Sequence, residues 1–169
     1  MIMYNFLTDP KFVQHRLEGE CYLFEDIQHP LPTWEDVIEN LNISIKNDWE
    51  VKSLPHHGFV THNAEIMPHV GELLKYISTT EFNVPSSAHC YFSITEFSHT
   101  FGRHRDISDV FFWQIIGKTE WTVESKIGTI MYILKPNDLL FVPKGMWHNT
   151  KPVTPRAGIS FGLDYPEDI

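Results

Sequence analysis

The sequence predicts a mainly β domain, a sandwich or a barrel, with helices in its N-terminal half. Two observations support this fold class. From residue 88 onward, short apolar and β-branched runs alternate with turns that contain glycine or proline. Before residue 88, apolar residues recur instead with the period of a helix. The 169 residues suffice for one domain with a proper core and are too few for two.

The first 50 residues contain two helix signals with a short strand between them. Residues 10–18 are expected to form a helix, because Asp9 can cap it and Pro10 suits its first position. Residues 20–25 have the composition of a strand. Thr33 is expected to cap a second helix, whose apolar stripe consists of Trp34, Val37, Ile38, Leu41 and Ile45.

The segment before the strand-rich half is more irregular. Residues 52–63 contain proline, glycine and three histidines, and they are expected to form a loop or an irregular strand. A further helix is expected from about residue 64 to residue 78. Pro68 then lies in its first turn, where a missing N–H costs little. Residues 81–87 are expected to connect this helix to the strands.

The second half is expected to contain eight strands of four to nine residues. Glycine and proline separate them at regular intervals, which is typical of a sandwich or a barrel. The expected strands are 89–97, 102–106, 110–116, 119–125, 129–134, 139–142, 146–151 and 157–163.

Composition limits the function classes. The formal net charge is −9 and no run of lysine and arginine is present, so nonspecific nucleic-acid binding is not expected. No apolar run approaches the ~20 residues of a spanning helix, and the start lacks the features of a signal peptide. Two cysteines are too few for a disulfide framework. A cytoplasmic protein is expected, and the oligomeric state cannot be inferred from the sequence.

Three residues form a candidate metal site. His104 and Asp106 are two positions apart, so on a strand they point the same way. His148 follows much later, at the end of a tight turn that begins at Pro143. Two imidazoles and one carboxylate on one face of an ion form the ligand set of non-haem Fe(II) oxygenases. The alternative is a buried histidine that bonds a carboxylate without any metal.

Residues 89–164 resemble the JmjC-like, cupin-type oxygenases that use Fe(II) and 2-oxoglutarate. The resemblance rests on the segments 104–106, 109–121, 137–143 and 145–148. It implies a double-stranded β-helix with the metal at one mouth of the barrel, held by His104, Asp106 and His148. Residues 1–88 match no motif. A single domain, 1–169, is therefore expected, in which residues 1–88 elaborate a β-helix core.

The chain departs from this family at the co-substrate site. A basic residue that binds the far carboxylate of 2-oxoglutarate commonly occupies the position of Thr119. Lys118 is adjacent and should face the other way. Arg156, at the start of the last strand, is the best substitute, because a buried arginine pairs well with a carboxylate. Thr119 itself, Tyr91 and Gln114 are further candidates for the co-substrate pocket.

The resemblance implies a 2-oxoglutarate-dependent dioxygenase, with hydroxylation favoured over demethylation. Two other classes remain open: a cupin-type metalloenzyme that does not use 2-oxoglutarate, for which Thr119 is the best argument, and a non-catalytic binding barrel. The substrate is not identified by the sequence. A protein side chain, a modified base and a small metabolite are all compatible with it.

Overall fold

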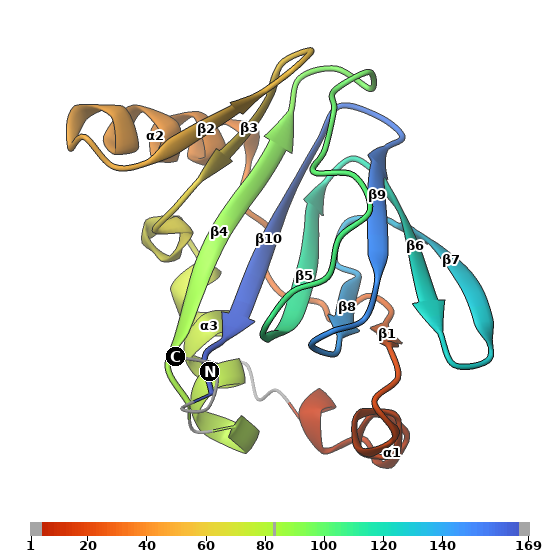
Figure 1. Cartoon of the computed structure of the whole chain (residues 1–169). Helices are drawn as coiled ribbons and strands as arrows, with labels where there is room; N and C mark the ends of the chain where they lie inside the picture. Colours follow the sequence, from red (N-terminus) through yellow and green to blue (C-terminus); the bar gives the residue numbers. More distant parts are fainter. Residues whose placement is uncertain (1–4, 83, 166–169) are drawn as a thin grey trace.

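The computed structural model describes residues 5–82 and 84–165, and it consists of two antiparallel sheets with helices on one side (Figure 1). The helices are α1 Pro10–Glu18, α2 Trp34–Lys46 and α3 Val70–Ile77, with 3-10 turns at Phe6–Thr8 and Ala64–Ile66 and a π-helical turn at Ser78–Phe82. The strands are β1 Tyr22–Phe24, β2 Val51–Leu54, β3 Gly58–Thr61, β4 Ser86–Ser93, β5 Asp109–Ile116, β6 Thr119–Ser125, β7 Gly128–Leu134, β8 Leu139–Val142, β9 His148–Pro152 and β10 Arg156–Leu163.

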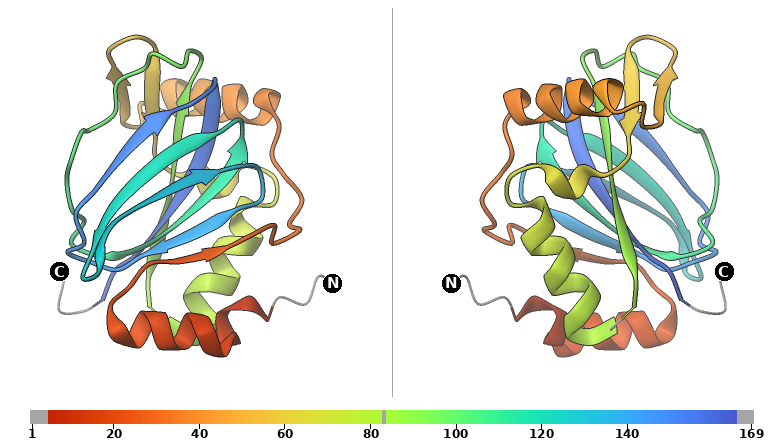
Figure 2. Two further views of the ribbon diagram at one scale, coloured as in Figure 1. Left: turned by 90° about the vertical axis from the view of Figure 1, so that its right-hand side faces the viewer. Right: turned by 90° about the vertical axis from the view of Figure 1, so that its left-hand side faces the viewer.

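The larger sheet has seven strands in the order β1-β8-β5-β10-β4-β3-β2, and the smaller has three in the order β7-β6-β9. The smaller sheet faces the larger one, and the strands between residues 86 and 163 close into a jelly-roll barrel (Figures 1 and 2). The prediction of a mainly β fold, a double-stranded β-helix with flanking helices, is therefore confirmed.

The strands of the larger sheet separate two apolar cores, because successive side chains point to opposite faces. On the outer face, α1, α2 and α3 cover the sheet, and Phe12, Val37 and Leu73 pack against Phe111 and Phe161. The inner core lies between the two sheets, and its buried residues are Cys21, Phe112, Trp121, Val123, Leu134, Leu140, Val142 and Met146. The helices thus stabilise the back of the sheet and leave the barrel interior to the strands.

Helices α1 and α2 begin where the sequence predicts. The Asp9 side chain accepts a hydrogen bond from the Lys11 N–H, and Thr33 forms a reciprocal capping box with Asp36. The predicted apolar stripe of α2 is wrong in part, because Ile38 is 51% exposed and Ile45 is 63% exposed.

The buried residues of α2 are Val37, Asn40 and Ser44, so two polar side chains share this face with the apolar ones. Thr61 Oγ1 donates to Asn40 Oδ1 at 2.6 Å, and Asn40 Nδ2 donates to Asn63 O at 3.4 Å. These polar contacts satisfy buried groups between α2 and β3, so the helix presents this face to the sheet.

Two boundaries differ from the predictions. The helix expected over residues 64–78 begins only at Val70, because Pro68 disfavours helical backbone in the residue before it and Met67 has ψ 149°. Residues 52–63, expected to be irregular, form the β2–β3 hairpin. Among the described residues no helix has the length and apolar character needed to cross a membrane.

Candidate metal centre

The two histidines of the candidate site lie opposite each other. His148 is the first residue of β9, and His104 lies in the long connection between β4 and β5. The predicted strand at 102–106 is reduced to a single bridge: His104 N donates to His148 O at 2.9 Å, and His148 N donates to His104 O at 2.8 Å. Because an antiparallel pair projects its two side chains to the same face, the imidazole centroids lie 4.3 Å apart.

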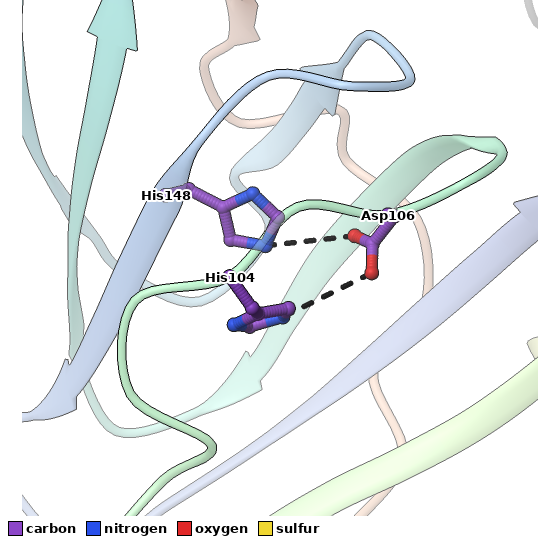
Figure 3. Close-up of side chains that lie close together, drawn as sticks. All are labelled: His104, Asp106 and His148. Carbon is purple, nitrogen blue, oxygen red and sulfur yellow. Dashed lines mark ion pairs between the residues drawn. The ribbon is translucent and has the colours of Figure 1, made fainter.

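Asp106 completes the triangle (Figure 3). Its Oδ1 lies 3.8 Å from His104 Nε2, and its Oδ2 lies 3.5 Å from His148 Nε2. The backbone of Asp106 is anchored too, since Gly145 N donates to Asp106 O at 2.8 Å. One ligand atom from each residue lies within 4.8 Å of the others. Ligands at right angles around an ion with bonds of about 2.1 Å are about 3 Å apart, so small side-chain movements would bring all three onto one ion.

Both imidazoles are oriented through their second ring nitrogen. Nδ1 of His104 lies 2.8 Å from Gly102 O, and Nδ1 of His148 lies 3.0 Å from Met146 O. A carbonyl oxygen only accepts, so each Nδ1 carries the proton and each Nε2 presents its lone pair toward Asp106. This is the tautomer that a divalent metal requires, and the donor set therefore fits such an ion.

The two histidines differ in exposure. His148 is 2% exposed, and the Trp121 ring stacks on it at 5.2 Å with an interplanar angle of 27°. Burial lowers the pKa of His148, which favours the neutral form that binds metals. His104 is half-buried at the edge of a cavity.

A cavity of about 370 Å³ opens beside the three residues and extends over the inner face of the larger sheet. Arg156, the first residue of β10, lines it and is only 4% exposed. Its Nη1 donates to Tyr91 O at 3.2 Å, and its Nε has no hydrogen-bond partner. Burial lowers the pKa of Arg156 to about 10. No carboxylate of the described residues pairs with this guanidinium, so a buried cation faces the cavity without a counter-charge.

The other predicted co-substrate residues divide into two groups. Tyr91 lines the cavity, and burial followed by the charge of Asp106 raises its pKa to about 12, so its hydroxyl stays protonated. Gln114 and Thr119 are fully buried and are not on the cavity wall. Gln114 Nε2 donates instead to Ile116 O at 2.8 Å and to Ala157 O at 3.3 Å, where a bulge interrupts the pairing of β5 and β10.

The far wall of the cavity was not predicted from the sequence. It carries Lys52 from β2 and His62 directly after β3, together with His89 from β4 and Asp164 directly after β10. The rings of His62 and His89 lie 4.3 Å apart, and Glu50 Oε2 lies 3.3 Å from His62 Nε2. Residues 87, 89 and 91 alternate along one strand, so the sequence could have placed them on one face of the sheet. No sequence motif marks the hairpin that completes this wall.

Fold and site together define a class: a double-stranded β-helix with a candidate metal triad at the mouth of the barrel. A search of solved structures returns proteins that share the fold. YcfD, a ribosomal oxygenase from Escherichia coli, superposes with a TM-score of 0.77 at 16% identity, covering 98% of this chain and 52% of that one. Its complex with cobalt and 2-oxoglutarate gives a TM-score of 0.74 at 17% identity, with 98% and 53% covered.

At this identity the likeness establishes the fold. The chain spans about half the length of the YcfD structures that it matches. No protein-family model matches the sequence, and a search of curated proteins gives no match.

Proposed function

We propose that this protein is an Fe(II)- and 2-oxoglutarate-dependent oxygenase, most simply a hydroxylase. One observation carries the proposal: the cavity holds both a two-histidine, one-carboxylate triad and a buried arginine that no carboxylate of residues 5–82 and 84–165 neutralises. A metal site alone is compatible with many reactions. A triad with an unpaired guanidinium in the same cavity suits a co-substrate that chelates a metal at one end and carries a carboxylate at the other.

His104, Asp106 and His148 would hold the iron, which when bound supplies the activation of dioxygen and the oxidative decarboxylation of 2-oxoglutarate. The chain itself supplies orientation. Gly102 O and Met146 O fix the two imidazoles, and the bridge between His104 and His148 sets their spacing. The facial arrangement leaves the cavity side of the triad open for a co-substrate.

Arg156 is assigned to the far carboxylate of 2-oxoglutarate, in place of the basic residue that is missing at position 119. Its guanidinium is positioned by the Tyr91 carbonyl. Because the guanidinium is shielded from water, a carboxylate that pairs with it through two hydrogen bonds would bind more tightly there than at the surface. Tyr91 is assigned to the same pocket as a hydroxyl donor. Thr119 and Gln114, off the cavity wall, would support the pocket from behind.

The substrate is proposed to be a protein side chain or a small molecule that enters from the side of Lys52 and His89. YcfD is described as a ribosomal oxygenase, and this favours a protein side chain here. We place the protein in the cytoplasm, since Cys21 and Cys90 are both free and buried. Residues 1–88 are assigned to the same domain as the barrel, because α1, α2 and α3 share the outer core.

The test is the conversion of 2-oxoglutarate to succinate by the purified protein with Fe(II) and dioxygen, even without a primary substrate. Succinate that depends on Fe(II), and that is lost with N-oxalylglycine, is the expected result. Metal binding without 2-oxoglutarate binding would support the cupin-type metalloenzyme that Thr119 suggests. If the protein bound no metal, the proposal would be contradicted, and the non-catalytic binding barrel would be the remaining hypothesis.

A further inference from the structure

Residues 94–108, which we call the strap, connect β4 to β5 and run past β9 in Figure 1. The strap carries His104 and Asp106, two of the three side chains of the candidate metal site, and its Thr100 and Phe101 line the cavity. A connecting segment opens more easily than a strand in the interior of a sheet. The contacts that hold the strap therefore also determine where two of the metal ligands lie.

The strap is fastened to both sheets. On the side of the smaller sheet, Thr100 Oγ1 donates to Thr150 O of β9 at 2.9 Å, and His104 pairs with His148 through the bridge described above. On the side of the larger sheet, the first residues of the strap lie on the β2–β3 hairpin, which belongs to the first half of the chain. This second attachment lies outside the segments that carry the family resemblance.

The tip of the hairpin, residues 55–57, holds the strap through its backbone. Three consecutive carbonyl groups of the tip each accept a hydrogen bond from the strap. In these bonds His99 N donates to Pro55 O at 3.0 Å, Thr95 Oγ1 to His56 O at 2.9 Å and Ile94 N to His57 O at 3.3 Å. The tip thus fixes both the start and the middle of the strap.

The backbone of the tip is strained. His56 has φ 60° and His57 has φ 66°, in the left-handed region that favours glycine and asparagine. Such a conformation in residues with a Cβ persists where surrounding contacts compensate for it, and it is often found at functional sites. Here the carbonyl groups of both strained residues are bonded to the strap, which indicates that the tip is shaped to hold it.

Gly58, the first residue of β3, lies directly against the strap. A Cβ added there would overlap Ser98 Oγ, whereas its next neighbours, His99 O and Leu54 Cβ, would be 3.3 Å away. Ser98 cannot turn aside freely, because it is only 7% exposed and its hydroxyl donates to His99 O at 3.0 Å. A glycine in a strand often marks such a close approach of another segment.

We propose that Gly58 is a positioning residue for the metal ligands: together with the tip, it lets the strap lie where His104 and Asp106 face His148. An alanine at this position would push the strap away from β3 in the free protein. Metal binding would then have to bring the strap back, and metal affinity would fall. By the same linkage, a bound metal would strengthen the contacts between the strap and the tip. The inference rests on the metal triad of the proposed function and does not depend on the use of 2-oxoglutarate.

Calorimetry with Mn(II) tests the proposal. Gly58→Ala should bind Mn(II) about tenfold more weakly than the wild type, as expected when the support of a ligand is disturbed. Ser98→Ala alone should stay close to the wild type. Adding Ser98→Ala to Gly58→Ala should restore most of the affinity, because it removes the overlapping oxygen. The matched control is Gly71→Ala in α3, where the new Cβ would be 3.0 Å from Glu65 O and far from the strap, and Mn(II) affinity should not change.

Hydrogen exchange of the metal-free protein gives a second readout, which does not depend on the metal. The Ile94 and His99 amides, both bonded to the tip, should exchange faster in Gly58→Ala than in the wild type or in Gly71→Ala. Thr95→Val, which keeps the side-chain shape and removes only the hydroxyl, should have the same effect and guards against misfolding of the glycine variant. In the wild type, Mn(II) should slow the exchange of both amides.

Three results would overturn the proposal: unchanged Mn(II) affinity in Gly58→Ala, equal losses in Gly58→Ala and Gly71→Ala, or unchanged exchange of both amides in Gly58→Ala and Thr95→Val. In each of these cases the wild type would still bind Mn(II), and the proposed function would stand. A wild type that bound no Mn(II) would instead contradict the proposed function, and the positioning role with it.

Discussion

The metal end and the anchor end of the cavity are built in different ways. At the metal end, three half-buried or buried side chains converge, and backbone carbonyls hold both imidazoles. At the anchor end, a single guanidinium is buried, with one hydrogen bond to Tyr91 O and no carboxylate partner in the described part of the chain.

The two ends therefore suit ligands of opposite charge. At the metal end, two Nε2 lone pairs and the Asp106 carboxylate converge, which suits a cation. At the anchor end, no carboxylate of the described residues pairs with Arg156, and burying an unpaired charge costs stability. Metal affinity should therefore depend on the positions of the three ligand side chains, and 2-oxoglutarate affinity on the charge of Arg156. Four substitutions test this contrast, from the largest expected effect to the smallest.

Asp106→Ala should have the largest effect. Removing an outer-shell partner commonly lowers metal affinity by about 10–100-fold, so removing a ligand should exceed about 100-fold. Calorimetry with Fe(II) under anaerobic conditions, or with Mn(II), measures this. The control is Asp164→Asn, which alters a carboxyl on the same cavity wall and should bind metal like the wild type. Equal loss in both variants would mean that Asp106 is not a ligand.

Arg156→Met should separate the two ends. Affinity for 2-oxoglutarate should fall about 10–100-fold, because a charge-assisted contact contributes about 1.5–3 kcal/mol, while metal affinity stays unchanged. The unliganded variant should be no less stable than the wild type, since an unpaired buried cation is removed. Lys118→Met is the control, because Lys118 is exposed and lies beside the position where the family carries its basic residue. Loss of affinity in Lys118→Met instead would place the anchor there.

The stability effect of Arg156→Met also has a predicted pH dependence. Burial lowers the folded-state pKa of Arg156 from 12.5 to about 10. Below that pKa the group is protonated in both states, so the cost of burying the charge is fully present, and it declines only as the pH rises past about 10. The difference in unfolding free energy between the variant and the wild type should therefore be constant from about pH 6 to pH 9. Urea titrations across this range measure it, and a steep slope would contradict the assignment.

Gly102→Ala should have an intermediate effect on the metal end. Gly102 has φ +73°, and its carbonyl holds His104 Nδ1, so an alanine would strain the backbone and disturb that contact. We expect metal affinity to fall about tenfold with 2-oxoglutarate contacts intact. Gly128→Ala is the matched control, since Gly128 also has a positive φ and open space but is the first residue of β7. Equal metal affinities in the two variants would count against a role for the Gly102 carbonyl.

Arg103→Ala should have the smallest effect. Arg103 is next to the triad in sequence, but its guanidinium forms an exposed bidentate pair with Glu124 and lies 3.9 Å from the Trp147 ring centroid. Exposed pairs contribute little. Metal and 2-oxoglutarate affinities should not change, whereas the pKa of Glu124, which Arg103 lowers, should rise in an NMR titration. A loss of 2-oxoglutarate affinity would show that Arg156 is not the only arginine at the anchor.

Local signals in the sequence determined much of this molecule. Asp9 and Thr33 marked the starts of α1 and α2, and short strand-like runs between turns that contain glycine or proline gave β6 and β8 to the residue. The spacing of His104 and Asp106, with the turn before His148, was enough to propose the triad. These features depend on neighbours a few residues apart, which a single sequence displays.

Long-range packing decided the rest. The buried face of α2 combines Val37 with Asn40, which bonds Thr61 and Asn63, so Ile38 and Ile45 remained outside. His104 lies in register with His148 through one bridge, where the sequence predicted a strand. Gln114 had the parity of a cavity residue, yet a bulge opposite Ala157 and Gly158 turned its amide to backbone carbonyls. The isolation of Arg156 from every described carboxylate is likewise a property of the closed barrel, because charge compensation depends on distances that only the tertiary structure fixes.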